Sequence, residues 1–595
     1  MSMPTPLDVL IIGAGPVGLT AAAEFTRYGL HVRVVDRKSG PTTDTRAPVL
    51  WPRTQEVYAM MGLREQFVPH AISFRTMDLY LYRKHIATFP YDDNDSPYPR
   101  PLLLTQGLTE TILKTHLEHI ERPVEYGVEA TSFEPDEAGF TVTLHHADGH
   151  EETVHASWLI GADGGLSAVR HTLGLDFARE ELKGSQIRVA DGHLRWTHPL
   201  GERGYFFIGE NTYLGYNPLP PFPDGRSRGY CYMLTPDPDP SDRSTPTVEE
   251  LQGVIRELSG DAGATLTDLQ WTNRIRFKFG VVPTMRKGRA FLVGDAAKVV
   301  IPLGGQGMNT GIQDAFNLAW KIAYVHKGLA TSELLDTFDI ERRRVALELQ
   351  DWIVRTIGFV RSPHPIKTFG VRTLAPLAFK LRAVEQYQAG QQTELKIHYP
   401  NSPLTEHHGK GALRAGRRAP DAAVVALPDR HDTRLFTLFT GTHWTLLLFA
   451  GTLEKANYGT SQWLASLAHA VERALPERVH THVIHAGQAP RDVSDGIVDG
   501  EYEAHGRYRA KQPTLVLIRP DGYIGFRGEL VDAPNLLAYL RRVFGANIAW
   551  TSSMQAGALK PTPSRSWQKG AAVLAGVSVL TWLITRVQRK GIRDG

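Results

Sequence analysis

A glycine-rich turn near the N-terminus limits the fold of this chain more than any other feature. Residues 13–18 read GAGPVG and match the pattern GxGxxG. They follow a short apolar run at residues 9–12 and open an apolar-faced stretch at residues 16–28. A second apolar run follows at residues 32–35. A strand, a tight turn, a helix and a strand in this order predict a βαβ unit.

The glycines of this turn have separate tasks. Gly13 permits the tight turn, Gly15 lets the backbone approach a pyrophosphate, and Gly18 lets the helix pack closely on the strand. The helix N-terminus adds free N–H donors and the positive end of a dipole. Asp36 ends the second strand, 18 residues after Gly18, where a carboxylate can accept the hydroxyls of an adenosine ribose. Together these features predict a dinucleotide site rather than an ordinary glycine turn.

Two later segments restrict which ligand the dinucleotide site is expected to bind. In residues 159–170, LIGADGGLSAVR, a strand runs into Asp163. Taken alone, this segment fits an ordinary Asp-Gly turn as well as it fits a ligand-binding segment. Residues 291–321, FLVGDAAKVVIPLGGQGMNTGIQDAFNLAWK, are more informative. Asp295 leaves a buried strand, where a carboxylate can bond a polyol chain such as ribityl.

The glycines of this last segment suit a flat ring system. Gly304, Gly305 and Gly307 remove side chains so that the backbone can lie against such a ring. The helix expected at residues 311–326 points its N-terminus back at the loop, which favours the negative charge that a reduced flavin carries. This geometry predicts a flavin.

Composition excludes several other functions. The chain has 595 residues, which predicts at least two domains. A formal net charge of +3 gives no electrostatic argument for nucleic acid. Cys231 is the only cysteine, so an intramolecular disulfide, a CxxC redox pair and a cysteine-based zinc site are excluded, and a reducing, cytoplasmic location fits. No HExxH motif is present, and we expect no metal.

The rest of the chain divides into further units. Residues 185–280 are rich in strand formers and aromatic residues and predict an inserted sheet; alternating aromatics favour core over ligand contacts. A small α/β domain is expected at residues 409–545, followed by a Pro/Ser/Thr-containing linker at residues 551–566. The aromatic residues of the inserted sheet are Tyr205, Phe206, Phe207, Tyr213, Tyr216, Tyr230 and Tyr232.

The C-terminus ends in an apolar segment with basic flanks. Residues 570–585 carry no charge and lie between Lys569 and Arg586. This run is shorter than the roughly 20 residues that cross a bilayer core, so a spanning helix requires thinning or snorkelling. A helix lying in the interface and a helix docked on the protein remain open. Basic-flanked apolar ends favour membrane association, which we predict for residues 567–593.

These motifs in combination identify a family. The chain resembles the FAD-dependent aromatic-ring hydroxylases over residues 7–395, the single-component group that includes phenol hydroxylase and polyketide hydroxylases. The resemblance implies an α/β fold in which a split Rossmann-type FAD-binding domain, residues 1–184 and 281–395, contains an inserted β-rich substrate domain, residues 185–280. Residues 409–545 resemble the thioredoxin-like domain of some members, with GRRAPDA and RPDGYIGFRG, but they lack cysteine, so a structural or dimer-forming role is expected.

The resemblance also assigns the cofactor site. For the nucleotide half of FAD, it places Gly13, Gly15, Gly18, Asp36 and Arg37 at the pyrophosphate and adenosine and the backbone of Val128 near adenine. For the flavin half, it places Arg46 and Gln106 beside the flavin, Gly294 and Asp295 at the ribityl chain, and Pro302, Gly304, Gly305, Gly307, Met308 and Asn309 along the isoalloxazine. Asp163 and Arg170 fall in a segment that serves both FAD and NAD(P)H. One departure is clear: the family has GDAAH, whereas this chain has GDAAK with Lys298, and PPxG becomes residues 301–304, IPLG.

The activity implied by the resemblance is aromatic hydroxylation. NADPH or NADH reduces the flavin, O2 forms a C4a-hydroperoxide, and its distal oxygen passes to a phenolic or polyketide-like substrate. No catalytic side chain is identified by the sequence. Alternatives are an epoxidase or hydroxylase of a lipophilic quinone or terpenoid-type substrate, and a membrane-tethered flavin-binding protein without oxygenase activity. A halogenase is disfavoured because no WxWxIP segment is present.

Overall fold

The structure is a computed structural model of the 595-residue chain. It describes residues 7–177, 180–181, 184–276, 278–301, 304–361, 392–409, 413–452, 458–488 and 496–545. The predicted linker, residues 551–566, and the predicted terminal helix, residues 567–593, lie outside the described residues.

The first sheet brings together chain segments that are far apart in the sequence. β1 (Leu7–Ile12) lies between β2 (Val32–Asp36) and β11 (Glu151–Gly161) and pairs with both in parallel, and β20 (Ala290–Leu292) pairs in parallel with the other side of β11. Parallel strands end at the same edge of a sheet. The turns after β1, β11 and β20, which carry the three predicted motifs, therefore meet at one edge. The sheet is completed by β8 (Glu125–Tyr126), β9 (Val128–Pro135), β10 (Phe140–His146) and β19 (Arg286–Lys287).

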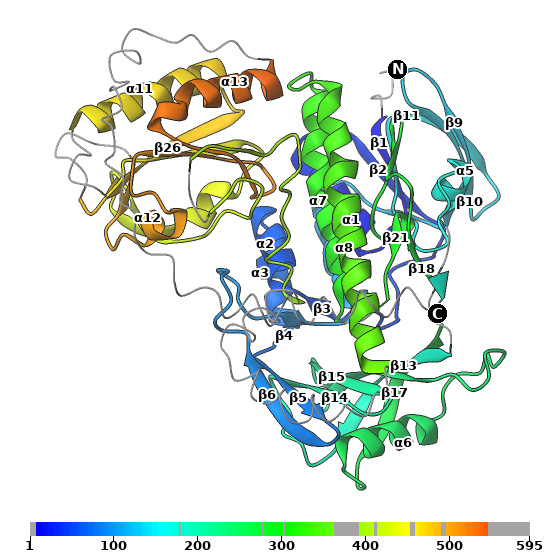
Figure 1. Cartoon of the computed structure of the whole chain (residues 1–595). Helices are drawn as coiled ribbons and strands as arrows, with labels where there is room; N and C mark the ends of the chain where they lie inside the picture. Colours follow the sequence, from blue (N-terminus) through cyan, green and yellow to red (C-terminus); the bar gives the residue numbers. More distant parts are fainter. Residues whose placement is uncertain are drawn as a thin grey trace, which may run out of the picture.

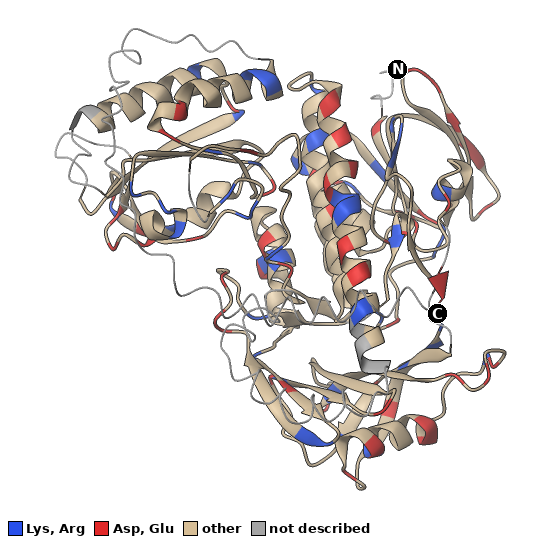
Figure 2. Cartoon of the chain, viewed as in Figure 1, with Lys and Arg blue, Asp and Glu red and all other residues tan. Residues whose placement is uncertain are grey.

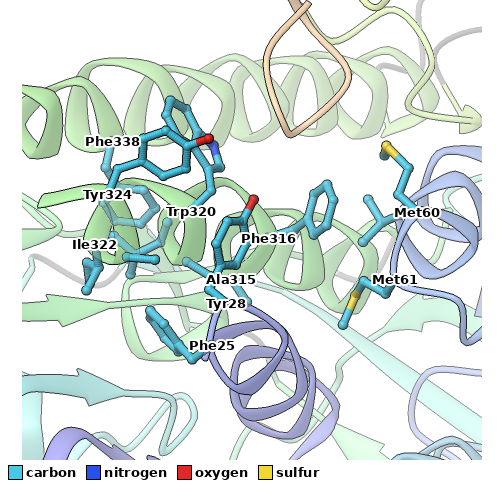
Figure 3. Packing of buried hydrophobic residues seen from close by; sticks show 14 of the residues in the cluster. Phe25, Tyr28, Met60, Met61, Ala315, Phe316, Trp320, Ile322, Tyr324 and Phe338 are labelled. Carbon is cyan, nitrogen blue, oxygen red and sulfur yellow. The ribbon is translucent and has the colours of Figure 1, made fainter. Parts of the chain in front are cut away.

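Helices cover this sheet and pack against one another. α7 (Gln306–His326) and α8 (Asp336–Arg361) run side by side through the middle of the molecule (Figure 1). Figure 3 shows Phe25 and Tyr28, at the end of α1 (Pro16–Arg27), gathered with Phe316 and Trp320 of α7; all four are buried. The other helices of this part are α2 (Pro52–Met60), α3 (Arg64–Phe67), α4 (Gln106–His119) and α5 (Ala168–Thr172).

The inserted sheet takes strands from two parts of the chain. Its order is β17-β13-β16-β15-β14-β5-β6, so two strands from before residue 100 extend the sheet predicted at residues 185–280. One face is covered by α6 (Val248–Ser259), and the other faces the end of α8 (Figure 1). The strands are β5 (Thr76–Leu81), β6 (Lys84–Pro90), β13 (Ser185–Arg195), β14 (Arg203–Ile208), β15 (Tyr213–Leu219), β16 (Arg228–Pro236) and β17 (Thr265–Ile275).

Short strands join these two units. They form two small sheets, one of which holds the backbone just before α2. Their bounds are β3 (Val49–Leu50), β4 (Ile72–Ser73), β7 (Leu102–Leu103), β12 (Glu180–Glu181), β18 (Lys278–Val281) and β21 (Lys298–Val299).

The C-terminal unit is a mixed α/β structure with its own sheet, in the order β22-β29-β28-β25-β26-β27-β23-β24. Strands β25 and β26 are parallel, and β28 and β29 continue the sheet in antiparallel pairs. α11 (Tyr458–Ala474) and α13 (Ala533–Phe544) lie together on one side, with α12 (Glu503–Tyr508) on the other (Figure 1). The strands are β22 (Glu406–His407), β23 (Ala423–Ala426), β24 (His431–Arg434), β25 (Trp444–Phe449), β26 (Val479–Ala486), β27 (Ile497–Asp499), β28 (Thr514–Ile518) and β29 (Ile524–Glu529).

A buried ionic junction joins this unit to the FAD-binding part. Arg519 lies 2.5 and 2.9 Å from the two carboxylate oxygens of Glu341 on α8, and Asn317 of α7 donates to both Glu341 and Asp521. Lys321 also pairs with Glu341 at 2.8 Å. Figure 2 shows acidic and basic residues interleaved along α8. Because the charges of Arg519, Glu341 and Lys321 in this junction are buried and paired with one another, removing one of them would leave its partner uncompensated.

Two findings refine the sequence predictions. α7 begins at Gln306 rather than near residue 311, because the glycine loop ends earlier, with Gly305 as the helix N-cap. Within the described part of the chain, no helix is long and apolar enough to cross a membrane.

Candidate cofactor site

The turn after β1 has the conformation that a pyrophosphate site requires. Gly13 has φ +106°, and a Cβ on Gly18 would lie 1.9 Å from the carbonyl oxygen of Gly13, so both positions require glycine. Gly15 differs: φ is −76°, and a Cβ there would meet no atom within 4 Å. Gly15 is also the N-cap of α1 and has no capping side chain. The turn thus leaves open space in front of the N–H groups of a helix N-terminus, which suits phosphate.

Asp36 is held in place at the end of β2. Its two carboxylate oxygens accept the N–H groups of Ala14 at 2.7 Å and Lys38 at 2.9 Å. A carboxylate has about four acceptor positions, so capacity remains for ribose hydroxyls. The backbone N–H of Gly127 donates to the carbonyl oxygen of Lys38 at 2.7 Å, so the next residue, Val128, lies close to the end of β2. Arg37 is exposed, 3.7 Å from Glu129.

The segment after β11 lies next to the turn after β1. Asp163 accepts the N–H groups of Ala168 and Val169 through Oδ2, while its buried Oδ1 has no hydrogen-bond partner among the described residues. Loss of hydration raises the pKa of Asp163. Arg170 is buried and donates to the carbonyl oxygens of Gly165 and Ala296. Arg170 therefore links this segment to the loop after β20, and Oδ1 of Asp163 is left unpaired among the described residues.

Asp295 leaves β20 in the same region. Its side chain is exposed although the residues on both sides of it are buried. Loss of hydration raises the pKa of Asp295, and the positive charges of Lys298 and Arg46 oppose this rise. The carboxyl of Asp295 is accessible, although the residues next to it are buried. Such a carboxyl can accept hydrogen bonds from the hydroxyl groups of a ribityl chain. Arg46 is exposed and pairs with Asp44 at 2.5 Å.

The loop before α7, which contains Gly304 and Gly305 and which we call the ring loop, has the bare backbone expected for a ring system. Gly304 and Gly305 have φ +79° and +65°, and a Cβ on Gly304 would point into open space. Gly305 is the N-cap of α7, again without a capping side chain. Gly307 and the half-buried Met308 follow in the first turn of α7. The positive end of the α7 dipole therefore faces this loop. Pro302 and Leu303 lie outside the described residues.

Two side chains hold this loop in position. The buried Asn309 donates to the carbonyl oxygens of Val49 and Gly305 at 2.8 Å and accepts the backbone N–H of Trp51 at 2.9 Å. Trp51 in turn donates from Nε1 to the carbonyl oxygen of Gly304 at 2.9 Å. Trp51 could not be identified from the sequence, because the residues around it show no pattern that relates it to residue 304.

Lys298 does not occupy an open position at the site. Its side chain is buried and forms an ion pair with Asp314 of α7, which also accepts from Arg342 at 2.7 Å. Loss of hydration lowers the pKa of Lys298, and Asp314 opposes this shift. The lysine that replaces the family histidine therefore joins an ionic network beneath the loop.

The segment that carries Arg46 is tied to both neighbouring units. Gln106 donates to Glu110 at 2.8 Å, and Glu110 accepts the N–H of Thr42 at 2.6 Å. On the other side, Thr45 donates to the buried Asp191 of the inserted sheet at 2.5 Å. Asp191 also accepts two hydrogen bonds from Arg228, at 2.6 and 2.7 Å. Asp191 could not be found by sequence reasoning, because its partners lie far from it along the chain.

The chemistry of the assembled residues fits FAD. Open space and N–H donors lie where a pyrophosphate would sit, oxygen acceptors lie where ribose and ribityl hydroxyls would sit, and bare glycine backbone lies where a flat ring would pass. Cys231 is buried, and loss of hydration raises the pKa of its thiol to about 12. No cluster of three or more His, Cys, Asp or Glu side chains in the described ranges could hold a metal ion.

Comparisons with known proteins agree with this arrangement. Residues 6–353 match the family described as FAD binding domain, and residues 413–547 match the family described as Aromatic-ring hydroxylase, C-terminal. The 6-methylpretetramide 4-monooxygenase of Streptomyces rimosus is 34% identical, over 91% of this chain and 94% of that protein. The pentachlorophenol 4-monooxygenase of Sphingobium chlorophenolicum is 31% identical, over 89% of this chain and 95% of that protein.

Solved structures match over the same length. Aklavinone-11 hydroxylase, in a ternary complex with FAD and aklavinone, has a TM-score of 0.69 and 26% identity, over 91% of this chain and 100% of that chain. Anhydrotetracycline hydroxylase from Streptomyces rimosus has a TM-score of 0.68 and 26% identity, with 91% and 99% coverage. The chain belongs to the FAD-dependent aromatic-ring hydroxylases and is an FAD-dependent monooxygenase.

Proposed function

We propose that this monooxygenase uses NAD(P)H and O2 to hydroxylate a phenolic or polyketide-type aromatic compound. The observation that carries the proposal is the aromatic face of the inserted sheet, which shares one buried cluster with Val300 and Ile301, next to the ring loop. A flat aromatic substrate held between this face and the flavin would be shielded from water on both sides. Relatives named for tetracycline-type substrates and for pentachlorophenol support this class of substrate.

The residues of this chain bind and orient the cofactor in the proposed reaction. When bound, FAD supplies electron transfer from NAD(P)H to O2 and transfer of one oxygen atom to the substrate. We assign the pyrophosphate to the turn at Gly15, the adenosine ribose to Asp36 and the ribityl chain to Asp295. The N-terminus of α7 would stabilise negative charge on a bound ring through its dipole. Trp51 and Asn309 keep the ring loop in its bare-backbone conformation.

An absorption experiment tests this proposal. The purified protein is reduced anaerobically with NADPH, alone and with anhydrotetracycline, aklavinone or pentachlorophenol, the compounds named for relatives. We expect a flavin spectrum that bleaches faster with at least one of them, because substrate stimulates reduction. A bound flavin that no compound helps to bleach would instead support a flavin-binding protein without oxygenase activity.

We also propose that residues 409–545 form a thioredoxin-like domain with a structural role. The parallel pair β25–β26, extended on one side by the antiparallel β28 and β29, supports that fold. Cys231 lies outside this range, so thiol exchange has no reactive group there. A homodimer, a cytoplasmic location and membrane association through residues 567–593 remain predictions.

A further inference from the structure

The aromatic residues of the inserted sheet divide between its two faces. Successive side chains of a strand point to opposite faces. The residues that pack with α6 are Tyr205, Phe207 and Tyr216. Those that face the FAD-binding part are Phe206, Tyr213, Tyr230 and Tyr232, which we call the aromatic wall. Both sets belong to buried clusters, as expected for core residues, and the second set also borders the FAD-binding part.

The aromatic wall faces the surroundings of the ring loop. Tyr213 and Tyr230 belong to the same buried cluster as Val300 and Ile301, which precede the loop, and Ile353 and Ile357 of α8. These flat rings and aliphatic side chains pack together and make an apolar environment beside the ring loop, of a kind that suits an aromatic compound.

Two contacts tie the wall to the expected flavin position. At one end, Tyr230 donates from its hydroxyl to the carbonyl oxygen of Arg46 at 3.5 Å. At the other, the ring of Tyr91 lies 5.9 Å from the ring of Trp51, and Trp51 donates to Gly304 of the ring loop. Phe206 of the wall packs against the buried cluster that contains Tyr91 and Trp51. The wall therefore lies beside the ring loop.

Tyr213 has an unusual hydroxyl group within the wall. Its ring lies 5.2 Å from that of Phe206 and 6.2 Å from that of Tyr232, and the side chain is 1% exposed. The hydroxyl has no hydrogen-bond partner in the described parts of the chain. By contrast, the buried Tyr205 on the α6 side donates to the carbonyl oxygen of Pro199 at 2.6 Å. A buried hydroxyl without a partner destabilises a folded protein unless something else accepts its hydrogen bond.

We propose that Tyr213 is a specificity-determining residue that donates a hydrogen bond to a carbonyl or phenolic oxygen of an aromatic substrate lying against the aromatic wall. The inference rests on the proposed function and adds a required feature of the substrate, an oxygen acceptor on a flat ring system. Loss of hydration raises the pKa of the Tyr213 hydroxyl far above neutral, so the group remains a proton donor during turnover. Substrates without the acceptor leave the hydroxyl unpaired and bind less well.

The test compares Tyr213→Phe with Tyr205→Phe in the FAD-loaded enzyme. Each variant removes one hydroxyl from a buried tyrosine of the same sheet. The measurements are the melting temperature without substrate and the KM and kcat of NADPH oxidation with the most stimulating of anhydrotetracycline, aklavinone and pentachlorophenol. For Tyr213→Phe we expect an unchanged or higher melting temperature and a KM raised roughly tenfold, with a smaller change in kcat. For Tyr205→Phe we expect a lower melting temperature and an unchanged KM.

Each other result overturns the inference. If Tyr213→Phe lowers the melting temperature as Tyr205→Phe does, the hydroxyl already has a partner in the folded protein and its role is structural. An unchanged KM in Tyr213→Phe, with normal stimulation of the unmodified enzyme, overturns the role of Tyr213 alone. If no compound stimulates the unmodified enzyme, the proposed substrate class fails and the inference fails with it.

Discussion

At the scale of single residues, the cofactor site depends on where side chains are absent as much as on where they are present. Gly18 and Gly15 belong to one motif, yet a Cβ at Gly18 would collide with Gly13, whereas a Cβ at Gly15 would enter open space. The first position therefore serves the fold, and the second serves the ligand. This difference can be measured.

Replacing these glycines should separate folding from cofactor binding. For Gly15→Ala we expect an almost unchanged free energy of unfolding without FAD, because the φ of −76° suits alanine and no atom is near. Its dissociation constant for FAD should rise at least about tenfold, because the methyl group occupies the pyrophosphate space. For Gly18→Ala, urea denaturation should show a large loss of stability. Tight FAD binding by Gly15→Ala would disprove the assignment of the pyrophosphate.

The buried Glu394 predicts a pH dependence of stability. Loss of hydration raises its pKa to about 8, and hydrogen bonds from Thr310 and Gln313 of α7 and the charges of Arg342 and Lys298 oppose the rise. The unfolded carboxyl has a pKa of about 4.3. The folded protein therefore holds a proton that the unfolded chain has lost, and wild-type stability falls as pH rises from about 4.3 to about 8.

A Glu394→Gln variant lacks this titration. Its stability relative to the wild type should increase across the same pH window, by an amount on the order of several kcal/mol, and then level off. Denaturation at about pH 5 and about pH 8.5 measures the difference, with the exposed Glu210→Gln as the control. A difference that stays constant with pH would show that Glu394 is ionised in the folded protein.

At the scale of elements, three parallel strands bring the cofactor motifs to one edge, and α7 aims its N-terminus at the ring loop. β1, α1 and β2 could be predicted because each has a local pattern: an apolar run, a GxGxxG turn and an apolar helix face. The two faces of the inserted sheet could not be assigned, because alternation separates Tyr205 from Phe206 without saying which of them faces the FAD-binding part. Asp191 and Trp51 were missed because their contacts depend on the packing of distant elements.

The hydrogen bond from Trp51 to Gly304 should contribute to cofactor binding. Trp51→Phe keeps the aromatic packing but loses this bond, so we expect the dissociation constant for FAD to rise about 2- to 12-fold, the equivalent of one hydrogen bond. Quenching of flavin fluorescence measures the constant. The matched control is Trp158→Phe, whose Nε1 donates to His326 at the opposite end of α7. Equal losses in both variants would argue against a specific role for Trp51.

At the scale of the whole molecule, the C-terminal unit is attached to the cofactor-binding part through the buried charges of Arg519, Glu341 and Asp521. The sequence predicted a separate domain from its new alternation of strands and helices. It did not predict this junction, because a buried ion pair depends on two surfaces that meet only in the folded chain. Lys298 shows the same limit: the departure from the family motif was visible, and its pairing with Asp314 was not.

The apolar C-terminus makes a prediction about the location of the whole protein. Deleting residues 567–593 should move the protein from the membrane fraction to the supernatant after high-speed centrifugation, because the basic-flanked apolar segment is lost. Deleting only the linker, residues 551–566, should leave the distribution unchanged. If the chain that keeps residues 567–593 is already in the supernatant, membrane association is wrong.

The central claim is that the enzyme transfers one atom of dioxygen to an aromatic ring. The most direct measurement is a turnover of the FAD-loaded protein with NADPH, an active aromatic compound and isotopically labelled dioxygen, followed by mass spectrometry of the product. We expect a hydroxylated product in which the new oxygen atom carries the label. NADPH consumption that yields only hydrogen peroxide, or a product whose new oxygen comes from water, would contradict it.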